Sequence, residues 1–499
     1  MRFTSIVAPL LGIWTSQTQL VVGQLYAPAK ITPPPIQREF RGIWVTTINN
    51  LCWPSKPGLP TEIQKKELVE ILDKAAEAGF NAILLQVRTA CDALYSSRFD
   101  PWSEVLSGTC GKPPEPFYDP LEFAITEAHK RGLELYAWLN PFRAWHPSFR
   151  SRPPQNHISN TKPELIRKYG QYLWLDPGEP DTKLYTLAVI SDILRRYNVD
   201  GIVFDDYFYP YPEKGQQAEK LEFPDEDTYR KYGAGVPKVE WRRKNIDSFV
   251  KNVSQLIINT KPWVKFGISP FGIWRPNNPK GVRGLDAYNE LGADSRGWLQ
   301  KGWVDFLAPQ LYWRTDSREQ NFSTLAKWWA AQKKHHCNLF ISLLANKSLD
   351  DWSVEELLAQ IQITRSTPGI NGHILFDARI LTSSNQTIAK ALKNKVYVKC
   401  ALPPQIHWRA RSARLPTPTV YLDTTNKVIK VALPKNLNSP PAWWILYTQT
   451  GLEKRWSIKI YPATVTALPL TYPFPEIVAV SLVDKYGATS APVGFKLIK

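Results

Sequence analysis

The chain has 499 residues, which is too long for one small domain and fits a large barrel followed by a smaller module. Its composition is that of a globular protein, because 43% of the residues are hydrophobic and only 21% are charged. The net charge of +17 favours an anionic partner, such as an acidic polysaccharide, a cell-wall polymer or a membrane surface. Nucleic acid is the weakest candidate, because the sequence has neither a long basic run nor zinc-finger spacing.

The N-terminus resembles a secretory signal peptide over residues 1–23. Arg2 is followed by no charged residue before Lys30, and an apolar core spans 6–14. This core is too short to predict a transmembrane span. We therefore expect an exported protein of the periplasm or cell envelope, with a disordered cytosolic tail as the alternative. Residues 24–38 are rich in proline and predict a linker.

From residue 39 to 397, apolar runs of strand length alternate with amphipathic runs of helix length. The predicted strands are 42–48, 82–87, 133–139, 201–206, 265–271, 305–312, 338–344 and 372–377. The predicted helices are 61–78, 120–130, 181–196, 239–260, 294–301, 322–336, 353–366 and 384–395. This alternation predicts an α/β fold, a (β/α)8 TIM barrel. A doubly wound open sheet is the alternative, but no glycine-rich phosphate-binding loop follows the first strand.

Three connections after predicted strands are unusually long: 88–119, 140–180 and 207–238. All three follow carboxyl ends of strands, where active sites of TIM barrels form. They are rich in Trp, Tyr, Pro and Arg. We expect them to wall an extended groove, as a polymer substrate requires.

The alternation of strand-length and helix-length runs stops after residue 397. Residues 398–417 are rich in proline and arginine and predict a second linker. Short alternating strands separated by turns then predict a small all-β sandwich over 418–499. The segment 480–490 resembles the closing hairpin of fibronectin type III modules. We expect a spacer or adhesion role there and no chemistry.

The run Gly201–Phe204 is typical of a buried parallel strand, and it ends in Asp205 and Asp206. Unpaired charges are costly to bury, so adjacent carboxylates at a strand tip indicate a functional site. Glycosidic bond hydrolysis needs carboxyl groups in this position. Because side chains alternate along a strand, we expect one aspartate to act directly and the other to orient a neighbour. The structural alternative is that one aspartate caps the following helix and the other pairs with a neighbouring arginine.

Other predicted strand ends carry aromatic and polar side chains, where a barrel positions its substrate. Indole and phenol faces stack on sugar rings, although core packing is the alternative for each ring. The structural alternative for Arg88 is an ion pair with Asp205 or Asp206. The structural alternative for Asn140 and Gln310 is that they hydrogen-bond backbone groups. We predict substrate contacts from Trp44, Gln86, Arg88, Asp92, Trp138, Asn140, Arg143, Tyr207, Tyr209, Ser269, Gln310, Tyr312 and Trp313.

The cysteines and histidines give no metal signature. The five cysteines, at 52, 91, 110, 337 and 400, lack metal-binding spacing, and the histidines form no His-x-His or His-Glu-x-x-His pattern. We therefore expect no catalytic metal and no cofactor. Cys91 and Cys110 bracket one loop, and in an oxidising compartment we expect them to form a disulfide.

Many short motifs occur in order along the barrel region. They are Arg41-Gly42-Ile43-Trp44, Trp53-Pro54-Ser55-Lys56-Pro57-Gly58-Leu59, Gln86-Val87-Arg88, Asp92-Ala93-Leu94-Tyr95, Trp138-Leu139-Asn140-Pro141, the stretch 205–212, Phe266-Gly267-Ile268-Ser269-Pro270-Phe271-Gly272 and Ala308-Pro309-Gln310-Leu311-Tyr312-Trp313. Together they resemble the glycosyl hydrolase-like 10 family. The resemblance implies a barrel that hydrolyses peptidoglycan glycan strands or a related envelope polysaccharide, with Asp205 and Asp206 at the family's acidic strand end. Cysteine at 91 and 110 departs from the family pattern, which supports the disulfide.

The second catalytic acid is not assigned by these patterns. Asp92, Asp294 and Asp316 are loop candidates, with the structural alternatives that Asp294 caps a helix and Asp316 is solvated. Asp377 lacks a family match. If the substrate carries an N-acetyl group, that group is the nucleophile of a substrate-assisted reaction, held by Tyr312.

Two other functions stay open at this point. One is a non-catalytic glycan-binding protein on a barrel scaffold, and the other is a hydrolase of a different exported polysaccharide. In each case the expected partner is a polysaccharide, without nucleic acid or a transmembrane span. The oligomeric state is not predicted.

Overall fold

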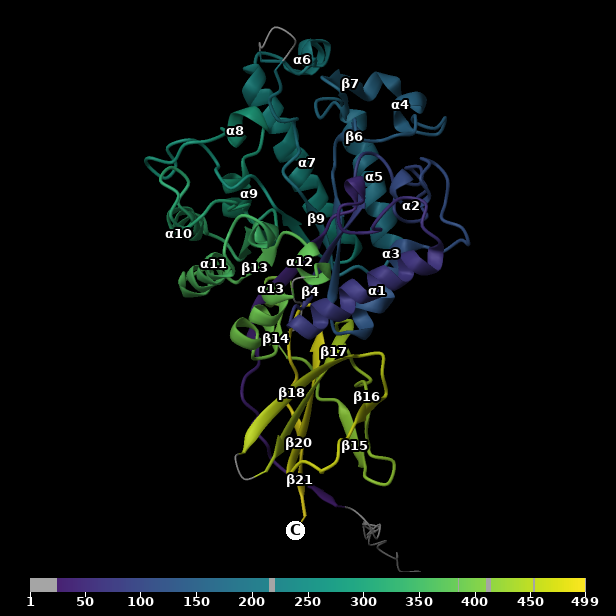
Figure 1. Cartoon of the computed structure of the whole chain (residues 1–499), viewed down its shortest axis with the longest axis vertical. Coiled ribbons are helices and arrows are strands. Elements are labelled where there is room, and N and C mark those ends of the chain that lie inside the picture. The colour runs from purple at the N-terminus through teal and green to yellow at the C-terminus, as the bar shows by residue number, and fades with distance from the viewer. Residues whose placement is uncertain (1–24, 215–219, 385, 410–413, 452–453, 499) are drawn as a thin grey trace, which may run out of the picture.

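The computed structural model describes residues 25–498, except 215–219, 385, 410–413 and 452–453. The predicted signal peptide at 1–23 lies outside the described residues. The chain forms a barrel surrounded by helices and a β-sandwich at one end of it (Figure 1). This arrangement confirms the predicted α/β barrel followed by a small all-β module.

Within the described residues, the barrel has eight parallel strands closed in the order β10-β11-β12-β13-β3-β4-β5-β9, which excludes the doubly wound sheet. They are β3 (Phe40–Val45), β4 (Ala82–Arg88), β5 (Glu134–Leu139), β9 (Gly201–Phe204), β10 (Lys265–Ile268), β11 (Phe306–Leu307), β12 (Asn338–Leu343) and β13 (Gly372–Leu375). β10 and β11 are shorter than predicted, because Pro270 and Pro309 cannot donate a hydrogen bond to a strand ladder.

Helices cover the outside of the barrel (Figure 1). They are α1 (Thr61–Ala78), α2 (Glu104–Ser107), α3 (Pro120–Lys130), α4 (Ile158–Thr161), α5 (Pro180–Arg196), α6 (Glu226–Tyr232), α7 (Lys238–Thr260), α8 (Ala287–Glu290), α9 (Ser295–Lys301), α10 (Phe322–Gln332), α11 (Val354–Ser366), α12 (Arg379–Thr382) and α13 (Thr387–Ala391), with short turns η1 (Ile48–Asn50), η2 (Pro163–Leu165), η3 (Ala345–Leu349) and η4 (Leu392–Val396). In α1, Leu68, Leu72 and Ala75 recur on one buried face, which packs the helix on the barrel. No helix in the described part is long and apolar enough to cross a membrane.

Aromatic rings fill the amino-terminal half of the barrel interior. Phe40 stacks on Phe340 with ring centroids 4.2 Å apart, and Tyr136 packs edge-on against Phe40 at 5.5 Å. Gly267 leaves the space that this packing needs, because a Cβ atom there would lie 1.9 Å from Phe306. Side chains thus close this half, and a substrate has to enter at the carboxyl ends of the strands.

The long connection after β5 folds into a small antiparallel sheet. It contains β6 (Arg143–Trp145), β7 (Ile166–Tyr169) and β8 (Tyr172–Leu175), in the order β6-β8-β7. Together with α4 and α6, this sheet lies at the end of the barrel remote from the sandwich (Figure 1). The connection after β5 therefore builds part of the wall around the barrel mouth.

The sandwich packs a five-stranded sheet, β1-β21-β20-β17-β18, on a three-stranded sheet, β15-β16-β19. Its strands are β1 (Tyr26–Pro28), β15 (Thr419–Asp423), β16 (Val428–Ala432), β17 (Pro441–Thr450), β18 (Arg455–Pro462), β19 (Ala467–Pro469), β20 (Ile477–Asp484) and β21 (Val493–Leu497). Ile429, Trp444 and Val480 belong to the buried cluster between the two sheets.

Both stretches predicted as linkers contain strands among their described residues. β1, from the proline-rich stretch 24–38, pairs antiparallel with β21. β2 (Gln37–Arg38) pairs with β14 (Ala401–Leu402), which lies inside the predicted linker 398–417. Proline is compatible with these positions because β1 is an edge strand, where a missing N–H is tolerated.

The sandwich is docked on the amino-terminal end of the barrel. Lys485 pairs with Asp200, just before β9, at 2.6 Å, and Arg409 pairs with Asp305, just before β11, at 2.7 Å. His129 also contacts Asp200 at 2.7 Å. Both aspartates are almost fully buried, so these pairs are internal to the joint. The sandwich therefore covers the end of the barrel opposite the mouth (Figure 1).

Candidate active site

The acidic pair lies at the carboxyl end of β9. Asp205 and Asp206 follow the last strand residue, Phe204, and are 4% and 3% exposed. β9 is hydrogen-bonded between β5 and β10, so side chains from the ends of these neighbouring strands surround the pair. The structure thus places both carboxylates at the strand end where the sequence predicts them.

Two donors hold the carboxylate of Asp205. The indole Nε1 of Trp138 donates to Oδ2 at 3.1 Å, and the amide Nδ2 of Asn140 donates to Oδ1 at 3.2 Å. The Oδ1 of Asn140 in turn accepts the backbone N–H of Arg143 at 2.8 Å, which fixes which end of the amide faces the carboxylate. Asp205 is therefore held in one orientation by neighbours that are themselves fixed.

Asp206 is bound by a different set of side chains. The hydroxyl of Tyr211 donates to its Oδ2, and Gln310 also hydrogen-bonds the carboxylate. The Nε2 of Gln310 donates to the backbone carbonyl of Ser269 at 3.0 Å, which ties together the ends of β10 and β11. The two carboxylates thus have separate supports, and each can be changed without removing the other's partners.

Burial raises the pKa of both carboxyl groups. The pKa of Asp205 rises to about 7, because desolvation and the negative charge of Asp206 outweigh the positive charge of Arg143. Desolvation also raises the pKa of Asp206, against the hydrogen bonds that it accepts. Near neutral pH the pair can therefore hold a proton, which a general acid needs for transfer to a leaving oxygen.

A second hydrogen-bonded group joins the ends of three other strands. The hydroxyl of Tyr312, after β11, lies 3.0 Å from Oγ of Ser342 on β12, and Nε1 of Trp44 on β3 donates to the same Oγ at 3.1 Å. Burial raises the pKa of Tyr312, and the negative charge of Asp206 adds to the shift. Ser342 was not predicted from the sequence, where the only indication of its role is that it is a small polar residue in an apolar strand.

A cavity of about 90 Å³ lies beside the acidic pair, and we call it the arginine pocket. The guanidinium carbon of Arg143 lies 4.9 Å from the ring centroid of Tyr207, and Nε of Arg143 donates to the carbonyl of Thr89 at 3.1 Å. Arg143 and Tyr207 were predicted from the sequence, whereas Tyr169, Tyr172 and Trp174 of the β6–β8 sheet were not. The full lining is Arg143, His146, Tyr169, Tyr172, Trp174, Tyr207, Pro210, Tyr211 and Glu213.

Gln86 and Asp92, both predicted to contact substrate, hold the backbone instead. The Oε1 of Gln86 accepts the N–H of Thr47 at 3.0 Å. The Oδ1 of Asp92 accepts the N–H of Thr89 at 2.7 Å. Both residues are almost fully buried, so their role is to shape the loops that follow β3 and β4.

Arg88 takes the structural role that was its alternative, although its partner is not the acidic pair. It forms a fully buried ion pair with Asp100 at 2.8 Å. Its Nη1 also donates to the backbone carbonyl of Asn140 at 2.6 Å. Arg88 therefore supports Asn140, and through it Asp205, from outside the barrel mouth.

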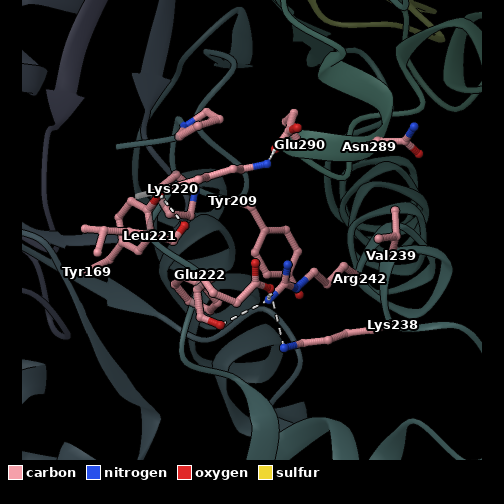
Figure 2. Close-up of a pocket in the computed structure, with 13 residues that line it drawn as sticks. Tyr169, Tyr209, Lys220, Leu221, Glu222, Lys238, Val239, Arg242, Asn289 and Glu290 are labelled. Carbon is pink, nitrogen blue, oxygen red and sulfur yellow. Dashed lines mark hydrogen bonds and ion pairs between the residues drawn. The ribbon is translucent and has the colours of Figure 1, made fainter. Parts of the chain in front are cut away.

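Tyr209, Ser269 and Trp313 are also placed in specific surroundings. Tyr209 is 2% exposed and lines a second cavity (Figure 2) rather than the arginine pocket. The Oγ of Ser269 donates to the backbone carbonyl of Ala308 at 2.8 Å. Trp313 packs edge-on against Phe271 and stays half-buried, so part of its ring is open to a ligand.

The second cavity has a volume of about 160 Å³ and charged walls (Figure 2). Arg242 and Lys238 pair with Asp225 at 2.6 and 3.0 Å. Lys220 pairs with Glu290 at 2.5 Å. Each of these three cations already has an acidic partner, so the cavity offers a polar surface of balanced charge.

The other carboxylates considered as a second acid are engaged elsewhere. Asp294 caps the first turn of α9, which was its structural alternative. Asp316 is exposed and pairs with Arg314 at 2.9 Å, while Asp377 pairs with Arg379 at 2.8 Å. In the part of the chain that the structure describes, no group of three or more His, Cys, Asp or Glu side chains is arranged to hold a metal ion.

The predicted disulfide is absent, which corrects the sequence-based expectation. All five cysteines lie among the described residues and carry free thiols. The Sγ of the buried Cys91 accepts a hydrogen bond from Arg88 at 3.0 Å, so it is directed at the guanidinium instead of Cys110. Burial raises the pKa of both thiols to about 12, which keeps them protonated.

Comparison with known proteins gives consistent matches. The family model described as glycosyl hydrolase-like 10 matches residues 39–356. Glycosyl hydrolase YngK of Bacillus subtilis is 35% identical over 436 residues, which cover 84% of each chain. Glycosyl hydrolase DigH of Escherichia coli K12 is 34% identical over 387 residues, 70% of this chain and 86% of that protein. The PgaB glycoside hydrolase domain from Bordetella bronchiseptica aligns with 74% of this chain and 100% of its own, at 18% identity and a TM-score of 0.48.

Proposed function

Because the chain belongs to the glycosyl hydrolase-like 10 family and is a glycoside hydrolase, we propose that it cleaves the glycan strands of peptidoglycan or a related envelope polysaccharide. The net charge of +17 supports an anionic wall polymer as substrate. The signal-like stretch at 1–23 supports export to the periplasm or cell envelope, where such a polymer lies. Aromatic side chains that stay half-buried at the barrel mouth, Tyr207 and Trp313, provide faces on which sugar rings stack.

We propose that Asp205 and Asp206 are the catalytic residues. The observation that carries this assignment is the pKa of Asp205, raised to about 7 by burial beside a second carboxylate. At neutral pH and below, the pair holds a proton that it donates to the leaving glycosidic oxygen. The remaining negative charge stabilises the positive charge that develops on the sugar ring.

The nucleophile in this proposal is the N-acetyl group of the substrate. The carboxylates of Asp294, Asp316 and Asp377 are engaged in a cap and two ion pairs, which favours an attacking group from the sugar itself. Its carbonyl oxygen attacks the anomeric carbon as the leaving oxygen takes the proton, and water then opens the cyclic intermediate. Tyr312, near Asp206, holds the acetamido group. The product retains its anomeric configuration, which NMR of the fresh product tests.

The test is reducing-end release from purified glycan strands, with and without stem peptides. Wild type is expected to release reducing ends, and Asp205→Asn and Asp206→Asn to lose activity by about 10²–10⁴-fold, the usual contribution of a general acid or base. Asp316→Asn, in an exposed loop of the same barrel, is the matched control and should retain activity. Binding without new reducing ends would instead favour a glycan-binding protein. Cleavage of other glycans alone would favour a different exported polysaccharide.

A further inference from the structure

Arg143 is a buried cation without an acidic partner among the described residues. It is 5% exposed, and no carboxylate of that part of the chain lies within 4.0 Å of its guanidinium. Its Nε donates to the carbonyl of Thr89, whereas Nη1 and Nη2 hydrogen-bond no described group. Arg41 and Arg88 are also buried, and they pair with a carboxylate at 2.7 Å and 2.8 Å, respectively. Arg143 is therefore exceptional among the buried arginines of the barrel.

The surroundings of Arg143 favour an external partner. Its guanidinium lies over the ring of Tyr207, which supports it without neutralising its charge. Burial and the charge of Arg143 lower the pKa of His146, another lining residue, to about 4, so this imidazole is neutral at pH 7. Glu213 also lines the pocket, and its Oε2 sits against Gly170, in the turn between β7 and β8. Glu213 is thus held beside the β7–β8 hairpin and forms no ion pair with Arg143.

A desolvated guanidinium costs free energy until an acceptor pairs with it. The planar fork of an arginine matches the two oxygens of a carboxylate. The arginine pocket, at about 90 Å³, has room for a carboxylate group. Tyr207 and Tyr211 form the wall between this pocket and the acidic pair, since Tyr211 also binds Asp206. A group held by Arg143 would therefore belong to the sugar at, or next to, the scissile bond.

Resting on the glycan hydrolysis proposed above, we propose that the arginine pocket binds a carboxylate carried by the substrate sugar, and that Arg143 determines specificity for acidic glycans. The second cavity does not share this property, because Arg242, Lys238 and Lys220 there are each paired with an acidic residue (Figure 2). The competing role for Arg143 is a purely electrostatic one, in which its charge acts on Asp205 alone. The two roles differ in whether a carboxylate on the substrate matters.

The experiment compares two forms of one substrate. Peptide-free glycan strands, whose muramic acids carry a free carboxylate, are assayed beside the same strands after carbodiimide activation and borohydride reduction, which turn the carboxylate into a hydroxymethyl group. The enzymes are wild type, Arg143→Met, Arg143→Lys and the charge-matched control Arg314→Met, which removes an exposed cation outside the pocket. KM and kcat are measured for each pair, with thermal unfolding as the check on folding.

We expect wild type and Arg314→Met to bind the acidic strands with a KM at least tenfold lower than the reduced strands, in line with the strength of a charged hydrogen-bonded pair. Arg143→Met should lose this preference through a higher KM on the acidic strands, while Arg143→Lys keeps part of it. If wild type cleaves both kinds of strand with the same KM, the inference is overturned but the proposed function stands. This comparison needs only wild type, so it tests the inference even if Arg143→Met does not fold. Equal losses of kcat on both strands in Arg143→Met also overturn it. Wild type that cleaves neither strand overturns the proposed function, and the inference with it.

Discussion

The indole Nε1 of Trp138 donates a hydrogen bond to the carboxylate of Asp205 at 3.1 Å. This bond favours the ionised form of Asp205, because the donor stabilises its negative charge. Burial acts in the opposite direction and is the larger effect, so the pKa of Asp205 is raised to about 7. The pKa of Asp205 is therefore a balance between desolvation and the hydrogen bonds from Trp138 and Asn140, and each donor can be removed separately.

Trp138→Phe should move the alkaline limb of the kcat/KM profile to higher pH. The substitution keeps an aromatic ring but removes the donor to Asp205, so the pKa of Asp205 rises further and the proton is retained longer. A pH–rate profile on glycan strands measures this shift. Trp44→Phe removes an indole donor to Ser342 and should leave the limb at its wild-type position. If the limb of Trp138→Phe does not move, a group other than Asp205 controls it.

Asp205→Asn should gain stability over wild type as the pH rises. The ordinary pKa of an aspartate is 3.8 and that of Asp205 is about 7, so between these values the folded protein binds the proton more tightly than the unfolded chain. Wild type therefore loses stability as pH rises through this window, by roughly 1–4 kcal/mol, whereas the asparagine variant lacks the contribution of Asp205 and keeps only that of Asp206. Urea unfolding at pH 5 and pH 8 measures the difference. Parallel behaviour of the two proteins would contradict the raised pKa, and Asp316→Asn, at an exposed site, should follow wild type.

Arg88→Met should destabilise the protein instead of changing substrate recognition. The substitution leaves Asp100 buried and unpaired, which typically costs about 3–5 kcal/mol. Urea unfolding should show this loss, whereas Arg98→Met, at an arginine whose side chain is 75% exposed, should remain near wild type. A stable Arg88→Met protein with only a raised KM would restore the original prediction that Arg88 contacts substrate.

Lys485→Met should weaken the joint between barrel and sandwich. Desolvation would raise the pKa of Asp200, but the charges of Lys485 and His129 outweigh it and hold this pKa well below the usual range. A lowered pKa stabilises the fold above the ordinary value of 3.8, and this contribution is lost as pH falls through that value and below. The variant should therefore lose most stability at neutral pH and little in acid. Calorimetry should show a lower Tm than for Lys459→Met, an exposed control on β18, and an unchanged Tm would contradict the role of the pair.

The barrel and the acidic pair could be predicted because their signals are local. Apolar strand-length runs alternate with amphipathic helices, and Asp205 and Asp206 directly follow such a run. The contacts of Gln86 and Arg88 could not be predicted in the same way. Arg88 meets Asp100 only because the loop after β4 turns back on the strand, and the sequence gives no sign of that path.

The arginine pocket and the docked sandwich depend on contacts between distant segments. His146 and Trp174 line the pocket because the connection after β5 forms its own sheet, whose short strands carry a weak periodicity. Lys485 and Asp200 are 285 residues apart, and neither stands out in its local sequence. The pairing of β1 with β21 was hidden for the same reason, since proline-rich composition suggested a linker.

Tyr26 and Leu497 are partners in the sandwich, so both ends of the described chain leave the protein beneath the barrel, on the side away from its mouth (Figure 1). A tag, a surface linker or a fusion partner attached at either end would therefore hang from the sandwich. Immobilised in this way, the enzyme would have the sandwich next to the support and the barrel mouth facing away from it, toward an insoluble polymer. Display on beads through either end should thus cost no access to large substrates.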